Sequence, residues 1–247
     1  MAELFSIVTV CLNAGKSLIK SVNSVIGQDF PSFHYIVKDG VSTDDSVGDL
    51  PHIDRLTVIS KADNGIYDAM NQALDYCEGE YVCFLNAGDT FHSPDTLSSV
   101  ARCIQRNQGA SICIGNAVVG EELKIHPKRF SSAFLYEGHI CHQAVFVKRQ
   151  LYLAEKGFNT NYRLLADRDF FIRAIWVRRE PYCVLPLTIC DYDVSGVTAR
   201  KEYQYLKEYE LRQIQNTYFG LRHRVWIWFY LKLAVKPFTL LRRTLVK

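Results

Sequence analysis

The stretch from residue 81 to residue 89, YVCFLNAGD, joins a run of apolar residues to a polar tail that ends in a carboxylate, Asp89. The apolar run is typical of a buried strand, and in open α/β sheets ligands bind beyond the carboxyl ends of the strands. Small residues let a ligand approach the backbone, and the oxygen atoms of Asp89 suit a hard cation such as Mg²⁺ or Mn²⁺. The sequence therefore predicts a site for a metal-held diphosphate.

Polar side chains also follow three earlier strand-like runs: Asn13 after the first, Asp39 after the second, and Lys61 and Asp63 after the third. Each of these residues alone is more often a turn or cap residue than a ligand. A parallel sheet, however, places all of its carboxyl ends on one side, where ligands bind. We therefore expect one crevice lined by these side chains and by Asp89.

The elements that must position these residues alternate between strands and helices through the first 115 residues. Apolar runs predict strands over residues 5–12, 33–38, 56–60, 81–85 and 110–114, with helices beginning near residues 18, 42, 67 and 94. This alternation predicts an α/β fold, with a mostly parallel sheet flanked by helices. Beyond it we expect strands near 144–148 and 183–189 and helices near 170–177 and 201–218. The predicted domains are a core of residues 1–200 and a helical extension of residues 201–247.

Four blocks of sequence occur in a specific order: residues 5–13 (FSIVTVCLN), 38–45 (KDGVSTDD), 63–71 (DNGIYDAMN) and 84–89 (FLNAGD). This series resembles the family 2 glycosyltransferases of the GT-A fold, especially bacterial enzymes of surface-polysaccharide assembly, over about residues 4–200. The resemblance implies an inverting transfer of a sugar from a nucleotide sugar to a hydroxyl of a lipid-linked or growing glycan. UDP is the nucleotide favoured by frequency in the family, with GDP and dTDP open.

The resemblance also implies roles for individual residues at the sheet edge. Asp89 would match the last carboxylate of the family's Asp-x-Asp element and bind the metal, and Asp39 would hydrogen-bond the nucleotide base. The other residues that would line the nucleotide site are Thr9, Asn13, Asp63, Gly65, Asn86 and Gly88. Acidic residues are frequent in the family at the positions of Asn86 and Gly88. A site with one carboxylate should therefore hold its metal weakly and depend on diphosphate oxygens and water.

A second group of carboxylates lies in the segment LADRDFFIR, where a helix is expected to begin near Asp167. A helix N-cap at Asp167 and a helix-dipole partner at Asp169 would explain both residues without a catalytic role. The resemblance instead makes Asp167 the general base that takes the proton of the acceptor hydroxyl. Ala166 replaces the Glu of the family's Glu-Asp pair. Asp169 would either orient Asp167 or bind the acceptor.

Three further motifs have competing interpretations. The spacing of His139 and His142 fits no common zinc signature, and the resemblance places His142 and Gln143 near the donor-sugar and acceptor pocket, with a structural histidine as the alternative. Residues 195–198 (SGVT) resemble a glycine-rich segment that orders over the diphosphate, or they form a turn. Residues 14–17 (AGKS) lack the glycine that a phosphate-binding P-loop needs five residues before Gly15, so a P-loop NTPase is rejected.

Charge is distributed unevenly along the 247 residues, of which 48% are hydrophobic. Residues 211–247 contain eight Lys or Arg and no acidic residue, which leaves 21 basic and 26 acidic side chains in residues 1–210. Residues 225–235 are apolar and aromatic. They predict a helix on an anionic membrane surface, with Trp226, Trp228 and Tyr230 at headgroup depth. Packing on the core or on a second subunit is the alternative, and nucleic acid is not an expected partner.

The eight cysteines show no Cys-x-x-Cys spacing, and the N-terminus begins directly with a strand-like run. We therefore expect free thiols, no signal peptide and a cytoplasmic protein, peripheral on the inner face of the plasma membrane. Two rival functions stay open. A sugar-nucleotide nucleotidyltransferase should carry a glycine-rich basic loop after its first strand, where only Gly15 and Lys16 occur. A non-catalytic GT-A-like assembly partner is compatible with the missing acidic residues at positions 86, 88 and 166.

Overall fold

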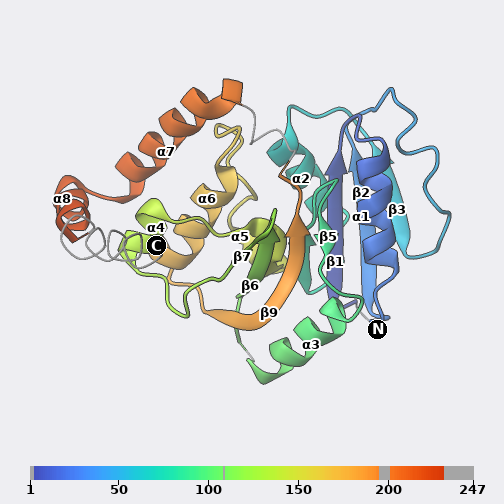
Figure 1. The fold of residues 1–247 in the computed structure, drawn as a ribbon, viewed down its shortest axis with the longest axis horizontal. Coiled ribbons are helices and arrows are strands. Elements are labelled where there is room, and N and C mark those ends of the chain that lie inside the picture. Colours follow the sequence, from blue (N-terminus) through green and yellow to red (C-terminus); the bar gives the residue numbers. More distant parts are fainter. Residues whose placement is uncertain (1–2, 108, 195–200, 231–247) are drawn as a thin grey trace, which may run out of the picture.

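The computed structural model describes residues 3–107, 109–194 and 201–230, and it shows one mixed sheet with helices on both faces (Figure 1). The strands are β1 Phe5–Cys11, β2 Phe33–Asp39, β3 Leu56–Ser60, β4 Tyr81–Phe84, β5 Thr90–Phe91, β6 Ile112–Val119, β7 Glu122–Lys124, β8 Val145–Lys148 and β9 Tyr182–Tyr192. The helices are α1 Lys16–Ile26, α2 Ile66–Leu74, α3 Thr96–Arg106, α4 Ser132–Glu137, α5 Arg149–Ala154, α6 Ala166–Phe171, α7 Gln204–Tyr218 and α8 Leu221–Tyr230.

The order of the strands is β3-β2-β1-β4-β8-β6-β9-β5, with β7 beside β6. The pairs among β3, β2, β1 and β4 are all parallel, as the alternating sequence pattern predicts. Beyond β4 the sheet is mixed, because β8 lies antiparallel between β4 and β6 while β6 and β9 are parallel. The expected parallel order therefore holds for the N-terminal half of the sheet. An apolar run such as residues 145–148 does not encode the direction in which it pairs.

Two apolar faces follow from the alternation of side chains along each buried strand. Phe5, Ile7 and Cys83 point to the face covered by α1 and α3, whereas Val8 and Phe84 point to the face covered by α2, α5 and α6. Burial on both faces explains why these strands are nearly continuous apolar runs. The sheet is therefore a rigid support for the polar residues at its edge.

The helix expected to begin at residue 42 is absent, and that prediction is wrong. Residues 43–49 form bends and turns, and Val41 and Asp45 have positive φ angles of 69° and 57°. The reason is local competition for backbone N–H groups: Asp39 accepts from the N–H groups of Val41 and Ser42, and Asn13 accepts from that of Thr43. Side chains that take these donors favour turns over helix.

The C-terminal helices pack against the core at the end of the molecule opposite to β3 (Figure 1). Ile214 of α7 and Ile227 of α8 are fully buried in the same apolar cluster as β4 and α6. Phe219, which lies between the two helices, is almost fully buried there as well. The division into a core of residues 1–200 and an extension of residues 201–247 stays a prediction, and these contacts show that α7 covers part of the core. Among the helices of the described residues, none is long and apolar enough to cross a bilayer.

Candidate functional site

The carboxyl ends of the parallel strands are level with one another. Cys11 at the end of β1 is the register partner of Asp39 in β2, which in turn is the partner of Ser60 in β3. Beyond β4, the N–H of Leu85 donates to the carbonyl of Val8 at 2.8 Å. The structure therefore brings the polar segments after β1, β2, β3 and β4 to one edge of the sheet, as the sequence predicts.

Asp39 is buried at this edge, and protein donors occupy both of its carboxylate oxygens. The hydroxyl of Ser60 donates to it at 2.6 Å and that of Ser42 at 2.5 Å, beside the N–H groups of Val41 and Ser42. Burial raises the pKa of Asp39, but these hydrogen bonds outweigh burial and hold the pKa below its ordinary value. In this structure the ionised carboxylate shapes the loop that follows β2.

Asn13 and Thr9, both predicted to line the nucleotide site, differ in exposure: Asn13 is exposed and Thr9 is buried. Asn13 is exposed beside that loop, with a φ of 50°, and its side-chain oxygen accepts from the N–H of Thr43 at 2.8 Å. Thr9 is fully buried inside the sheet, where its hydroxyl donates to the carbonyl of Leu85 at 2.6 Å and meets the Tyr35 hydroxyl at 2.8 Å. Thr9 therefore lines no open pocket in this structure and supports β1 from within.

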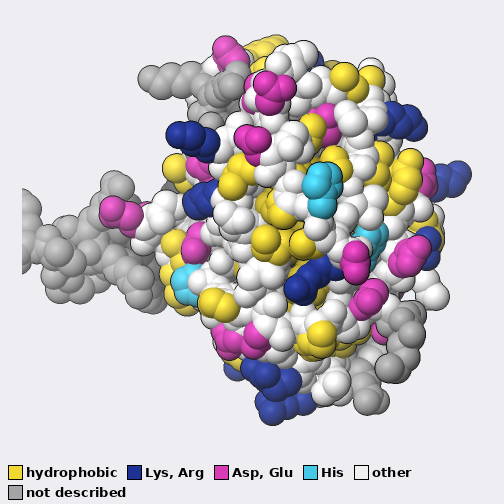
Figure 2. Space-filling view, turned by 90° about the vertical axis from the view of Figure 1, so that its right-hand side faces the viewer, with side chains coloured by type: hydrophobic (Ala, Val, Ile, Leu, Met, Phe, Trp, Pro, Cys, Tyr) yellow, Lys and Arg dark blue, Asp and Glu magenta, His cyan; other side chains and the backbone are white. Residues whose placement is uncertain are grey.

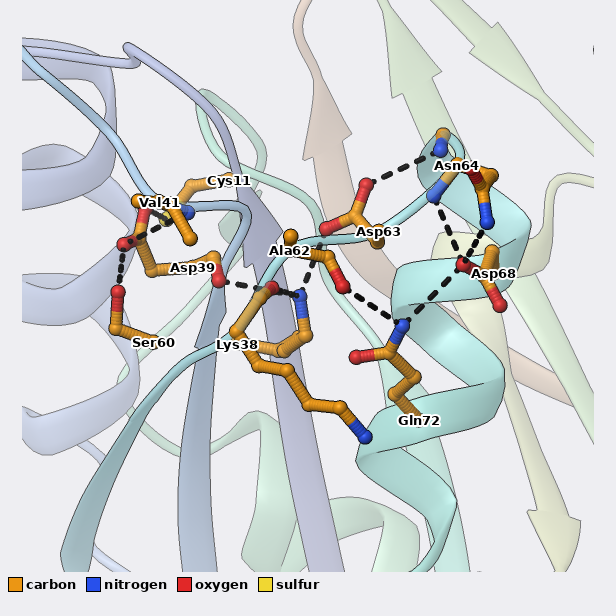
Figure 3. Close-up of polar contacts among 12 residues, drawn as sticks. Cys11, Lys38, Asp39, Val41, Ser60, Ala62, Asp63, Asn64, Asp68 and Gln72 are labelled. Atoms are coloured by element: carbon orange, nitrogen blue, oxygen red, sulfur yellow. Dashed lines mark hydrogen bonds and ion pairs between the residues drawn. The ribbon is translucent and has the colours of Figure 1, made fainter.

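Lys38 is a fully buried cation at the centre of the edge, and the sequence analysis assigned it no role. Its Nζ donates to Asp63 Oδ2 at 2.7 Å, to the carbonyl of Lys61 at 2.6 Å and to that of Asp39 at 3.1 Å (Figure 3). The other oxygen of Asp63 accepts from the N–H of Gly65 at 3.1 Å. Lys38 thereby joins the ends of β2 and β3 to the start of α2. A lysine inside a buried run signals such a partner, because a buried charge needs one.

Ser21 of α1 fixes the loop of residues 86–89 through hydrogen bonds of its hydroxyl. The hydroxyl of Ser21 donates to the carbonyl of Asp89 at 2.7 Å and accepts from the N–H of Gly88 at 2.8 Å. Gly88 has a φ of 101°, and a Cβ added to it would lie 2.5 Å from Asp193 Oδ2. Both the positive φ and the lack of space for a Cβ therefore favour glycine at position 88. Asp193, which the sequence did not single out, places a second carboxylate beside the loop.

Asp89 is 3% exposed and accepts two hydrogen bonds, from the N–H of Asp193 at 2.7 Å and from Gln143 Nε2 at 3.0 Å. Burial raises the pKa of Asp89 to about 6, although both hydrogen bonds act to lower it. Gln143 thus contacts the predicted metal ligand, and its place in a sugar pocket stays a prediction. Asp193 comes just after β9, so the strand-end rule that found the other carboxylates applies to it as well.

The carboxylates of Asp89 and Asp193 suit a hard divalent cation, yet they do not complete a metal site. Within residues 3–107, 109–194 and 201–230, no group of three or more His, Cys, Asp or Glu side chains could hold a metal ion. Mg²⁺ commonly takes one or two carboxylates and completes its shell with phosphate oxygens and water. The residues present therefore fit a metal that arrives together with a diphosphate.

Asp167 lies almost fully buried in the first turn of α6, 2% exposed. One carboxylate oxygen accepts from the Tyr67 hydroxyl at 2.9 Å and from the N–H of Arg168 at 2.8 Å, and the other lies 3.0 Å from His142 Nδ1. Burial acts to raise the pKa of Asp167, but hydrogen bonding from His142 and the neighbouring histidines hold it well below its ordinary value. Asp167 is therefore an ionised carboxylate and a weak base in this environment.

His142 connects Asp167 to the sheet edge. Its second ring nitrogen, Nε2, lies 3.1 Å from the side-chain nitrogen of Asn86, three residues before Asp89. Burial lowers the pKa of His142, but the hydrogen bond and the charge of Asp167 outweigh burial and raise the pKa above its ordinary value. His139 Nε2 lies 3.9 Å from Asp167, with its side chain 52% exposed. The structure thus brings Asn86, His142 and Asp167 into one chain of contacts.

Two other carboxylates near α6 have structural partners. Asp169 accepts from Arg173 Nε at 2.9 Å and from the Tyr218 hydroxyl at 2.7 Å, so in this structure it holds neighbouring helices and does not contact Asp167. Glu210 of α7 accepts from the backbone N–H groups of residues 163, 164 and 165 at 2.7, 3.0 and 3.0 Å. Glu210 was missed by the sequence analysis, because no local pattern links a helix to a segment 45 residues earlier.

A surface hollow of about 540 Å³ is lined by nine residues between positions 47 and 58, beside the edge strand β3. On the face shown in Figure 2, acidic and basic side chains are scattered among hydrophobic and neutral ones, with no large patch of a single charge. Residues 195–198 and residues 231–247, including Lys236, Arg242 and Arg243, lie outside the described residues.

The chain has the GT-A fold, with a sheet that is parallel from β3 to β4 and mixed beyond β4. The family model of glycosyl transferase family 2 matches residues 6–174, and the chain belongs to this family. The resemblance seen in the four sequence blocks is thereby confirmed, and the protein is a glycosyltransferase.

Relatives and solved structures agree with this assignment. The chain is 33% identical over 183 residues, 70% of each chain, to a PGL/p-HBAD biosynthesis glycosyltransferase of Mycobacterium bovis. It is 30% identical over 112 residues to the amylovoran biosynthesis glycosyltransferase AmsB of Erwinia amylovora. This alignment covers 42% of this chain and 37% of AmsB. The mannosyltransferase PcManGT from Pyrobaculum calidifontis, in complex with GDP-Man and Mn²⁺, has a TM-score of 0.67 at 17% identity, over 95% of this chain and 71% of that one. S. aureus TarS 1-349 in complex with UDP-GlcNAc has a TM-score of 0.63 at 17% identity, over 94% and 76%.

Proposed function

We propose that the protein transfers a sugar, with inversion at the anomeric carbon, from a nucleotide-diphosphate sugar to a hydroxyl of a lipid-linked or growing glycan in surface polysaccharide or glycolipid biosynthesis. One observation carries the proposal: a chain of contacts joins Asn86, in the Asp89 loop, to His142 and Asp167. The pair of His142 and Asp167 is called the basic centre below. A donor held at Asp89 and an acceptor at the basic centre would meet at a single reaction point.

The donor would lie along the carboxyl edge of the sheet. Asp39, Asn13, Asp63 and Gly65 border the proposed nucleotide position, and Asp89, with Asp193 beside it, would hold the metal. A divalent metal bound with the donor would offset the charge that develops on the leaving diphosphate. Backbone around Gly88 is held by Ser21, so a diphosphate would meet a prearranged loop.

The nucleotide is proposed to be UDP. Support comes from the relatives of known fold, since TarS binds UDP-GlcNAc, while PcManGT binds GDP-Man and keeps GDP as the alternative. The curated relatives in glycolipid and amylovoran biosynthesis support an acceptor that is a lipid-linked or growing glycan. We also propose that the protein works in the cytoplasm, peripheral on the inner face of the membrane, where such an acceptor would be presented.

The nucleotidyltransferase alternative is disfavoured by the start of α1. There the N–H of Gly15 donates to Asp44 Oδ2 at 3.1 Å and to the hydroxyl of Ser46 at 2.8 Å. A carboxylate of the protein thus occupies the place where a triphosphate-binding loop would receive its anion. The non-catalytic alternative would keep nucleotide binding but show no turnover.

A donor screen tests the proposal. The protein is incubated with Mn²⁺ or Mg²⁺ and a panel of UDP-, GDP- and dTDP-sugars, and nucleoside diphosphate release is measured with and without glycan acceptors. One donor should give release that an acceptor accelerates, and Asp89→Ala should lower the rate at least about 10²-fold, because charge stabilisation at the leaving group is lost. The matched control is Asp191→Ala, a half-exposed aspartate near the end of β9 whose partner is His92. Pyrophosphate release with a nucleoside triphosphate, or binding of nucleotide without any turnover, would contradict the proposal.

A further inference from the structure

A pair of thiols lies at the amino ends of β6 and β9. Cys113 and Cys183 are register partners in this parallel pair of strands, and their sulfur atoms lie 3.4 Å apart. Because β4 and β6 are both antiparallel to β8, these amino ends lie at the edge of the sheet opposite to Asp89. All eight cysteines of the chain are free in the structure. The pair is therefore separate from the machinery of the proposed sugar transfer.

The geometry of the two residues suits a disulfide bond. Neighbouring strands of a sheet lie about 4.7–4.9 Å apart, and disulfides usually join residues whose Cα atoms are roughly 4.4–6.8 Å apart. The contact between the two sulfur atoms means that both side chains already point toward each other. A bond between Cys113 and Cys183 therefore needs only a small movement of the side chains and no exchange of strand partners.

The surroundings of the pair favour reaction at Cys183. The hydrogen bond between the two thiols lowers the pKa of Cys183, although burial acts to raise it. The same hydrogen bond and burial raise the pKa of Cys113, against the charge of Lys148 on the neighbouring strand β8. Since the thiolate is the reactive form of cysteine, Cys183 is the better nucleophile of the two.

The two thiols also differ in their access to solvent. Cys113 is fully buried, whereas Cys183 is only partly buried against the apolar cluster that α3 covers. A small reagent therefore reaches Cys183 first. Cys141 and Cys190 also share a hydrogen bond, but they are 7% and 0% exposed and are thus shielded from the same reagent.

We propose that Cys113 and Cys183 are an oxidation site that a hydroperoxide converts into a reversible disulfide. The Cys183 thiolate attacks one oxygen of hydrogen peroxide, and the O–O bond breaks. A sulfenic acid forms on Cys183, and the other oxygen leaves as hydroxide and takes up a proton. Cys113 then attacks the Cys183 sulfur, the S–O bond breaks, and water leaves. In total, two thiols and one hydrogen peroxide give one disulfide and two water molecules, and the two electrons lost by sulfur reduce the peroxide.

The neighbouring thiol of Cys113 would keep Cys183 within the reversible part of cysteine oxidation. A sulfenic acid that meets no thiol is oxidised further to sulfinic acid, which is irreversible in nearly all proteins. A disulfide stops this reaction, and small thiols of a reducing compartment then restore both cysteines by exchange. The expected role of the pair is therefore protection of the sheet against permanent oxidation.

The test treats the whole reduced protein with hydrogen peroxide and blocks the remaining thiols with N-ethylmaleimide in denaturant. Peptides are then mapped by mass spectrometry without reduction. The unmodified protein should lose two of its eight free thiols and yield one peptide pair that joins Cys113 to Cys183. Dithiothreitol should restore both thiols. This measurement needs no substitution, so it does not depend on the folding of a variant.

Two variants separate the roles of the thiols. Cys113→Ser should form no such peptide pair and should accumulate sulfinic acid at Cys183, because the sulfenic acid meets no thiol. Cys183→Ser should leave Cys113 reduced at the same dose of peroxide. The matched control is Cys103→Ser, which removes a partly buried thiol packed against the same apolar cluster and should leave the peptide pair unchanged.

Three results would overturn the proposal. The first is that Cys113 and Cys183 both remain thiols at a dose of peroxide that fully oxidises glutathione in the same solution. The second is a disulfide that joins either residue to another cysteine, such as Cys103. The third is a Cys183 that stays reduced in Cys113→Ser, since the peroxide would then not react at Cys183.

Discussion

At the scale of single residues, the carboxylate of Asp193 packs directly against the backbone of Gly88. The positive φ of Gly88 turns the chain sharply before Asp89, and the missing side chain leaves room for Asp193. Asp193 in turn donates its N–H to Asp89. The position of the predicted metal ligand therefore depends on a glycine that sequence comparison alone would score as the loss of an acidic residue.

Gly88→Ala should destabilise the protein and weaken its metal-dependent binding of nucleoside diphosphate. The strained φ should cost about 1–3 kcal/mol, and the new Cβ, 2.5 Å from Asp193 Oδ2, would displace the Asp193 carboxylate. Denaturant unfolding and calorimetric titration with and without Mn²⁺ measure the two effects. Gly109→Ala is the matched control, because Gly109 has a φ of 94° and nothing within 4 Å of an added Cβ. Equal effects of the two substitutions on nucleotide binding would show that Asp193 plays no part.

Much of the edge was predictable because strand ends carry a local signal. Asp39, Asp63 and Asp89 each follow an apolar run, and a parallel sheet brings such ends together. The role of Lys38 and the link from Gln143 to Asp89 were not predictable, because they depend on which strands become neighbours. Thr9 was misplaced for a related reason: a polar residue within an apolar strand can satisfy its hydroxyl inside the sheet, as Thr9 does with Leu85.

Among the elements, α7 determines where the segment before α6 lies. Glu210 accepts three backbone N–H groups of residues 163–165, directly before the turn that carries Asp167. A buried carboxylate that satisfies several N–H groups replaces the water or cap that a helix start otherwise requires. The predicted extension therefore contributes to the position of the basic centre.

Glu210→Gln should lower the free energy of unfolding by roughly 1–3 kcal/mol, because the amide nitrogen cannot accept and leaves at least one N–H group unpaired. The transfer rate should also fall, since Asp167 follows this segment. Glu208→Gln on the same helix is the control, because Glu208 is exposed. Urea denaturation and kcat are measured for both variants, and equal stability of the two would refute the role of Glu210.

The order of strands and helices in the first half of the chain was largely predictable from the sequence, whereas the arrangement of the second half was not. Residues 56–60 and 81–84 become strands as their composition predicts. The insertion of β8 between β4 and β6, and the change from α6 to a π-helix at Ile172–Val177, depend on packing between distant segments. The bends and turns at residues 43–49 show the same limit on a smaller scale, because the side chains of Asp39 and Asn13 that shape this loop belong to other elements.

At the scale of the whole molecule, α8 carries exposed aromatic and basic residues, and we propose that this helix is the membrane contact. Trp226 and Trp228 are 57% and 54% exposed, and Leu221 and Arg222 are exposed at the start of the same helix, while Ile227 is buried against the core. Indole rings favour the headgroup region of a bilayer, and basic residues favour anionic lipids. The exposed tryptophans of α8 therefore support the proposed membrane contact.

Replacement of both tryptophans, Trp226→Ser with Trp228→Ser, should abolish most binding to vesicles of phosphatidylcholine with anionic phosphatidylserine. Binding of the unmodified protein should weaken at high salt, because charge screening reduces the attraction of the basic residues to the lipid. Vesicle sedimentation measures both effects, with nucleotide affinity as a check that the variant is folded. The control is Tyr205→Ser with Tyr209→Ser, which removes two aromatic rings that are 82% and 53% exposed on α7. Unchanged vesicle binding of the tryptophan variant, or an equal loss in the tyrosine variant, would exclude α8 as the membrane contact.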